Sequence, residues 1–95
     1  MEITFLGGTV AKKVVALPLP PNQELLSAET LGQFIRARRT QAGLSIHDAA
    51  DFCGIAVGTL DKIERATGDV RLSNVLTACS MLGITISIEA KEKTF

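Results

Sequence analysis

No stretch of the sequence approaches the roughly 18 consecutive apolar residues that a membrane-spanning helix needs. The N-terminus also lacks the charged segment, apolar segment and small-residue cleavage site of a secretory signal peptide. We therefore expect a cytoplasmic protein without membrane contact. Its 95 residues are enough for one small domain. A domain of this size buries a modest share of its surface and gains stability from forming an oligomer.

Cysteine and histidine are scarce, because the chain has two cysteines, Cys53 and Cys79, and one histidine, His47. These residues do not match the ligand spacing of a zinc site, so we expect no metal. Both cysteines occupy apolar helical positions, which is typical of buried, reduced thiols. A cysteine–histidine nucleophile needs an exposed thiol, and the sequence has no glycine-rich phosphate loop. We therefore expect no catalytic residue, no cofactor and no enzyme activity.

Net charge is also absent, since 10 basic residues balance 10 acidic residues. A domain that binds nucleic acid usually carries an excess of basic residues, so this balance counts against such a partner. Net charge is a mean over the whole surface, however, and a basic face with an acidic back gives the same total. The balance therefore lowers the expected affinity for DNA without excluding DNA.

Residues 1–26 differ in pattern from the rest of the chain. β-Branched and aromatic residues flank Gly7-Gly8, which predicts a hairpin with strands near residues 2–6 and 9–16. A flexible arm is the alternative interpretation. Prolines at positions 18, 20 and 21 then predict a stiff, extended linker.

Residues 27–83 show helical periodicity and predict four to five helices. Ser27 and Ser45 are expected N-caps, and Gly43 and Gly54 are expected to end the first two helices. The predicted inner faces, in chain order, consist of Leu31, Phe34, Ile35 and Ala42; Ile46, Ala49, Ala50 and Cys53; Leu60 and Ile63; and Leu72, Val75, Leu76, Cys79 and Leu82.

Residues 84–95 form the third part of the chain. Ile84, Ile86 and Ile88 alternate with polar residues, which predicts a strand with one buried face. A lone strand is marginally stable in water, so it must pair with the N-terminal hairpin or with its own copy in a second subunit. We expect the three isoleucines to face the shared core of a homodimer. Residues 91–95 are expected to form a polar tail.

Two short helices joined by a tight turn predict a helix-turn-helix centred on residues 44–66. The small Ala50 lets the second helix cross closely, and Ile55 is expected to anchor the turn in the core. The outer face of the second helix is then free to enter a DNA major groove. That face comprises Val57, Gly58, Thr59, Asp61, Lys62 and Arg65. Basic residues around it are expected to contact phosphates, or else to form a solvated helix surface: Arg36, Arg38, Lys62, Arg65 and Arg71.

The stretch GLSIHDAADFCGIAVGTLDKIERATGDVRLSNVLTACSMLGI resembles the Cro/Xre repressor family over about residues 31–84. The preceding LGQFIRARR and the strand after Gly83 resemble the HipB-like antitoxin branch most. The resemblance implies a mainly helical, phage-repressor-like domain whose C-terminal strand forms a dimer sheet. The framework positions that carry it are Gly43, Leu44, Ala50, Gly54, Ile55, Thr59, Ile63, Glu64, Arg65, Leu72, Leu76, Leu82 and Gly83.

The resemblance also implies an ion pair between Arg39, late in the first helix, and Glu64, late in the recognition helix. We expect this pair to be structural rather than a DNA contact, with a solvated surface pair as the alternative. Ser45 and Ile46 stand where the family contacts a phosphate, but the family's glutamine is replaced by Ile46. Val57-Gly58 replaces the usual polar pair. Ala56 and Ala66 replace the usual capping serine and glycine.

Three hypotheses for function follow. The first is an antitoxin and autorepressor that binds double-stranded DNA as a homodimer on a palindromic operator and also binds a HipA-like kinase toxin. The second is a stand-alone phage or host regulator without a toxin. The third is a protein-interaction module that kept the fold and lost DNA binding, which Ile46, Val57 and Gly58 favour.

Overall fold

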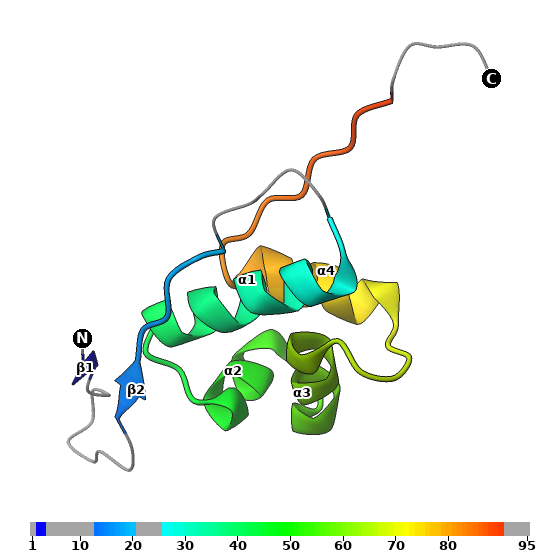
Figure 1. Ribbon diagram of the computed structural model, residues 1–95. Coiled ribbons are helices and arrows are strands. Elements are labelled where there is room, and N and C mark those ends of the chain that lie inside the picture. The colour runs from blue at the N-terminus through cyan, green and yellow to red at the C-terminus, as the bar shows by residue number, and fades with distance from the viewer. Residues whose placement is uncertain (1, 4–12, 21–25, 91–95) are drawn as a thin grey trace.

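The computed structural model describes residues 2–3, 13–20 and 26–90 (Figure 1). Within these ranges the chain is mainly helical, as predicted, with two short strands and four helices. In chain order they are β1 (Glu2–Ile3), β2 (Val14–Val15), α1 (Ala28–Gln41), α2 (Ile46–Cys53), α3 (Val57–Arg65) and α4 (Leu72–Met81). Helix α1 packs on α3, and α2 packs on both α3 and α4.

Helices α1 and α2 begin where their capping residues predict. The Ser27 hydroxyl accepts a hydrogen bond from the Thr30 backbone N–H at 3.0 Å. The Ser45 hydroxyl accepts one from the Asp48 backbone N–H at 3.1 Å. Each bond satisfies an N–H that has no partner within its helix. Gly54 ends α2 in the left-handed conformation at φ +71°, which a residue without a Cβ adopts at little cost.

Helix α3 has no such capping groups. Ala56 makes no side-chain cap hydrogen bond at its N-terminus, and Ala66 adopts φ +56° at its C-terminus. For a residue with a Cβ, the left-handed conformation costs roughly 1–2 kcal/mol. Burial offsets this cost, since Leu60 and Ile63 of α3 are almost fully buried. The position of α3 therefore depends on tertiary packing rather than on local capping.

The hydrophobic core lies between the four helices, with Ile35 and Leu60 fully buried. Most of the predicted inner faces are buried there. The core residues are Ile35, Ala49, Ala50, Cys53, Leu60, Ile63, Val75, Ala78, Cys79 and Leu82.

Three residues predicted to face this core are exposed instead. Leu72 and Leu76 of α4 are 68% and 47% exposed, and Ala42 at the C-cap of α1 is exposed as well. Helix α4 carries apolar residues around more of its circumference than the other helices cover. Periodicity placed all five predicted residues of α4 on one inner face, but packing against α2 and α3 buries only the part of it that contains Val75 and Cys79.

The N-terminal segment lies against α1. Strand β1 pairs antiparallel with β2, with Ile3 opposite Val14; a two-residue turn at Gly7-Gly8 would place Ile3 opposite Lys12. That turn lies outside the described residues. Val14 is buried, the Leu17 N–H donates to the Thr40 hydroxyl at 2.9 Å, and the Gln41 side-chain amide donates to the Leu17 carbonyl at 2.8 Å. We call residues 13–17 the N-terminal strap.

The expected strand after Gly83 is not formed within residues 84–90. Ile84 and Ile86 are half-buried against the core, whereas Ile88 is 96% exposed. Among the described residues, β1 and β2 pair with each other and this segment joins neither of them. An extended segment becomes a strand when a neighbour receives its backbone hydrogen bonds. The pattern of alternation predicted the direction of the side chains but not the presence of that neighbour.

Helix α1 crosses α3 at Gly32, which is buried. A Cβ at this position would lie 2.6 Å from the backbone carbonyl oxygens of both Ile63 and Glu64. Because these oxygens belong to the α3 backbone, a larger residue would force the two helices apart. Gly32 therefore sets how closely α1 approaches α3, a role that the apolar periodicity of α1 did not reveal.

We expect Gly32→Ala to lower the free energy of unfolding by about 1–3 kcal/mol, the usual cost of overpacking a core. The matched control is Gly58→Ala in α3, where a Cβ would meet nothing within 4 Å. That change should be neutral or stabilising by up to about 1 kcal/mol, because alanine favours the helix. Denaturant unfolding followed by circular dichroism measures both. Equal effects of the two changes would contradict the close approach at Gly32.

Candidate nucleic-acid interface

Helices α2 and α3 form a helix-turn-helix through the turn at residues 54–56. The Ile55 N–H donates to the Ala50 carbonyl at 3.0 Å, and the Gly54 N–H donates to the Asp51 carbonyl at 3.2 Å. Ala49 and Ala50 are buried, and Ile55 is half-buried against the core. These contacts hold the two helices in a tight turn and leave one face of α3 open to solvent.

The open face of α3 contains the residues that the sequence assigned to a major groove. Val57, Gly58, Lys62 and Arg65 are exposed, and Thr59 and Asp61 are half-buried. A Cβ at Gly58 would meet nothing within 4 Å, so the surface at the start of α3 is open at this position. A face of this kind, on the second helix of the motif, is the part that enters a groove and contacts base edges.

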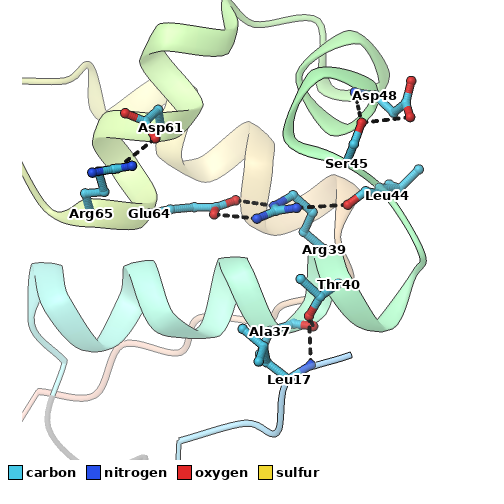
Figure 2. A network of polar contacts seen from close by, with 10 residues as sticks. All are labelled: Leu17, Ala37, Arg39, Thr40, Leu44, Ser45, Asp48, Asp61, Glu64 and Arg65. Carbon is cyan, nitrogen blue, oxygen red and sulfur yellow. Dashed lines mark hydrogen bonds and ion pairs between the residues drawn. The ribbon is translucent and has the colours of Figure 1, made fainter. Parts of the chain in front are cut away.

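Arg39 and Glu64 form a bidentate ion pair behind this face (Figure 2). Arg39 Nε donates to Glu64 Oε2 at 2.7 Å, and Arg39 Nη2 donates to Glu64 Oε1 at 3.0 Å. The remaining guanidinium nitrogen, Nη1, donates to the Leu44 carbonyl at 2.9 Å. The two side chains are 11% and 5% exposed. One arginine of α1 therefore contacts both α3 and the link between α1 and α2.

A second ion pair lies on the surface of α3 itself. Arg65 Nε is 2.9 Å from Asp61 Oδ1, one helical turn away, and the two side chains are 72% and 45% exposed. An exposed pair at this spacing stabilises a helix by roughly 0.3–0.5 kcal/mol. Its main effect is electrostatic, because the carboxylate offsets the positive charge of Arg65 on the face that would approach DNA.

A cleft of about 740 Å³ opens beside this face. We call it the strap cleft, because it is lined by the N-terminal strap, by α1, by the first residues of α2 and by α3. Arg36 of α1, His47 of α2 and Arg65 of α3 all line it. Helical periodicity and motif spacing did not predict this cleft, since the strap and the helix-turn-helix approach each other only in the folded chain.

Residues 30–87, more than half of the chain, match a family model described as "Helix-turn-helix domain". The chain belongs to this family. Among solved structures it is similar in fold to a chain titled "MDT Protein", with a TM-score of 0.62 and 19% sequence identity. The similarity covers 76% of this chain and 100% of the other chain. No curated protein matches the chain significantly.

Helix-turn-helix domains are typical of regulators that bind DNA, and most predicted contact residues of this helix-turn-helix protein surround the open face of α3. Arg36 is exposed and lines the strap cleft, and Arg71 is exposed at the N-cap of α4. Ser45 caps α2, and its hydroxyl also lies 2.8 Å from Asp48 Oδ2. Ile46 is half-buried against the core, so the residue at the family's phosphate-binding position contributes mainly to packing.

Arg38 does not lie with the other predicted phosphate contacts. Its Nε donates to the Leu82 carbonyl at 3.1 Å, and its Nη1 donates to Gln41 Oε1 at 3.0 Å. A cation at this position satisfies a carbonyl at the C-terminus of α4 and interacts favourably with the helix dipole. The structure therefore places Arg38 in the contact between α1 and α4, a contact that helical spacing does not predict.

The two thiols are buried in the core. Burial raises the pKa of both Cys53 and Cys79, which keeps them protonated and weakly nucleophilic at neutral pH. Over the described ranges, His, Cys, Asp and Glu side chains nowhere gather in threes as a metal site requires. No helix in the same ranges has the length and apolarity to cross a membrane.

We expect Arg39→Ala and Glu64→Ala each to lower the free energy of unfolding by about 3 kcal/mol, because each leaves a largely buried charge without its partner. Asp61→Ala and Arg65→Ala serve as the exposed control pair, with changes below about 0.5 kcal/mol. Thermal and denaturant unfolding measure all four, and the double variants give the coupling energies. An Arg39–Glu64 coupling as small as that of the control pair would contradict a structural role.

Proposed function

We propose that this protein is a sequence-specific DNA-binding repressor that acts as a homodimer on a palindromic operator. The observation that carries the proposal is the open face of α3, which Arg39, Glu64 and the close crossing at Gly32 hold in a fixed orientation. A rigid helix that projects from a helix-turn-helix is suited to the width of the major groove.

The contacts on this face divide into apolar and polar ones. Val57, which is 37% exposed, suits the methyl group of a thymine, and Thr59 and Lys62 can donate to a base edge or a phosphate. Positive charge on the face comes from Lys62 and Arg65, Arg36 lines the cleft beside it, and Arg71 is exposed at the N-cap of α4. Since Asp61 offsets Arg65 and Arg38 is engaged elsewhere, each subunit makes few phosphate contacts. Two subunits on one operator compensate for the modest affinity of each.

Exposed apolar side chains support the homodimer. Leu72, Leu76 and Ile88 are 68%, 47% and 96% exposed, and residues 84–90 form no strand within the described chain. A second copy that pairs with this segment would satisfy its backbone and cover these side chains. Ile84, Ile86 and Ile88 would then face one shared core, as the alternation predicts.

The resemblance to HipB-like proteins extends the proposal to an antitoxin that binds a HipA-like kinase. Phe52 and Met81 are 53% and 41% exposed and line a second cleft with Arg38 and Leu44, which offers a surface for such a partner apart from α3. Co-purification of a kinase from the native host, after removal of DNA, tests this part. If no kinase is recovered, the result supports a repressor that acts without a toxin.

A protein-interaction module without DNA binding is the second candidate. Two observations favour it: Ile46 packs against the core instead of presenting a polar group, and Asp61 neutralises Arg65 on the reading face. The dependence of binding on salt separates this candidate from a repressor, because phosphate contacts release counterions and weaken steeply as salt rises.

We expect the protein to shift duplex DNA from upstream of its own gene at low salt, with log K falling linearly against log salt. Lys62→Gln should weaken binding and reduce that slope by about 0.9 for each subunit, the effect of one lost phosphate contact. Arg38→Gln is the control with the same change of charge: it should lower the melting temperature and leave the slope unchanged, because Arg38 contacts α4. A wild-type protein that shifts no DNA at 50 mM salt or below, roughly the low-salt regime, would rule out the repressor.

We expect Ile88→Asp to convert a dimer into a folded monomer. The side chain is 96% exposed within the chain, so the change should leave the helical circular dichroism intact while it places a charge in the shared core. Leu26→Asp, at a residue that is 67% exposed before α1, is the control and should remain dimeric. Sedimentation velocity at micromolar concentration measures both. The dimer through residues 84–90 is wrong if Ile88→Asp sediments like the wild type.

A further inference from the structure

We propose that the N-terminal strap is a second DNA-contacting element, and that the strap cleft receives the sugar-phosphate backbone beside the groove that α3 enters. This inference rests on the proposed DNA binding and adds to it a contact outside the helix-turn-helix. It assigns a role to residues 13–17, which lie outside the part of the chain that matches the helix-turn-helix family.

The position of the cleft is the first argument. When the second helix of a helix-turn-helix lies in the major groove, the first helix crosses the sugar-phosphate backbone. Ser45, Ile46 and His47 at the start of α2 line the strap cleft, as do Asp61 and Arg65 of α3. Figure 1 shows β2 beside the same end of the domain as α2. The backbone that borders the groove therefore passes the opening of the cleft.

Charge is the second argument. Among the described lining residues, the arginines are Arg36, Arg39 and Arg65, and the carboxylates are Asp61 and Glu64. Both carboxylates are already paired with arginines of the cleft. Arg36, which is exposed, therefore adds a positive charge beyond these two ion pairs, in a chain that carries no net charge as a whole. A phosphate backbone is the polyanion that matches such a charge beside a helix-turn-helix.

The strap is also held in place before any ligand arrives. Leu17 makes two hydrogen bonds to α1, through Thr40 and Gln41, and Val14 is buried and paired with Ile3. Val15, the next residue, is 61% exposed and lines the cleft. A segment that is already ordered, as the N-terminal strap is, loses little conformational entropy on binding. Val15 is therefore a suitable position at which to test contact, since its side chain contributes little to the core.

The first test uses cleavage of DNA by a reagent on the strap. The chain has two native cysteines, both buried, so Val15→Cys provides an exposed thiol that can be modified selectively with an iron–EDTA group. With peroxide and ascorbate, the tethered iron should cut the DNA backbone next to each recognition-helix contact. Leu26→Cys, modified in the same way at an exposed residue outside the cleft, should cut only at background level.

The outcomes separate the strap from the helix-turn-helix. If the modified Val15→Cys protein shifts DNA as the wild type does and gives no more cleavage than Leu26→Cys, the strap does not contact the backbone and the inference is overturned, while the proposed function stands. If the unmodified wild type shifts no DNA at low salt, the proposed function fails and the inference fails with it.

The second test measures charge in the cleft. Val15→Lys should tighten binding several-fold at low salt and steepen the log K against log salt slope by about 0.9 for each subunit, the effect of one added phosphate contact. Leu19→Lys adds the same charge at an exposed residue outside the cleft and should leave the slope unchanged. Weaker binding by Val15→Lys, or equal slopes for the two variants, would overturn the inference, because the strap would then block the DNA or lie away from it.

Discussion

The bidentate contact between Arg39 and Glu64 determines how this domain presents α3. Glu64 lies near the end of α3, Arg39 lies near the end of α1, and the third guanidinium bond reaches Leu44 in the link to α2. Helix α3 lacks a side-chain N-cap and ends at an alanine in the left-handed conformation, so its own sequence does little to fix its ends. The ion pair and the burial of Leu60 therefore hold α3 in place through tertiary contacts, because local capping does not.

The sequence predicted most of what depends on neighbours along the chain. Ser27, Ser45 and Gly54 identify helix ends because their capping bonds are local. The Arg39–Glu64 pairing came from family resemblance rather than from spacing, since the two residues are 25 positions apart. Features that depend on contacts between residues far apart in the sequence, with no motif to indicate them, were not predicted. They are the contact of Arg38 with the end of α4, the close approach of α1 to α3 at Gly32, the exposed Leu72 and Leu76, and the strap cleft. A pattern of apolar residues shows that a face is buried, but not what buries it.

The candidate interface combines an intact framework with a nearly neutral surface. Ile46 packs inward and Asp61 offsets the charge of Arg65. The face of α3 therefore presents its shape and a few hydrogen-bonding groups rather than a large net charge. The strap cleft contributes the exposed cation Arg36 beside this face. Under the proposed function, this arrangement would leave base contacts to α3 and backbone contacts to its surroundings, which is how specificity and positioning are divided in protein–DNA interfaces generally.

The close crossing at Gly32 has a consequence for what kind of DNA this domain can recognise. Gly32 lies against the carbonyls of Ile63 and Glu64, and Arg39, seven residues later on α1, is bonded to Glu64, so two contacts hold α3 against α1. A recognition helix that cannot change its position requires the DNA duplex to deform to fit it. The stiffness and groove width of an operator, including base pairs that no side chain touches, then enter the binding energy. Under the proposed function, the buried Gly32 thereby makes the stiffness of the DNA one of the properties on which recognition depends.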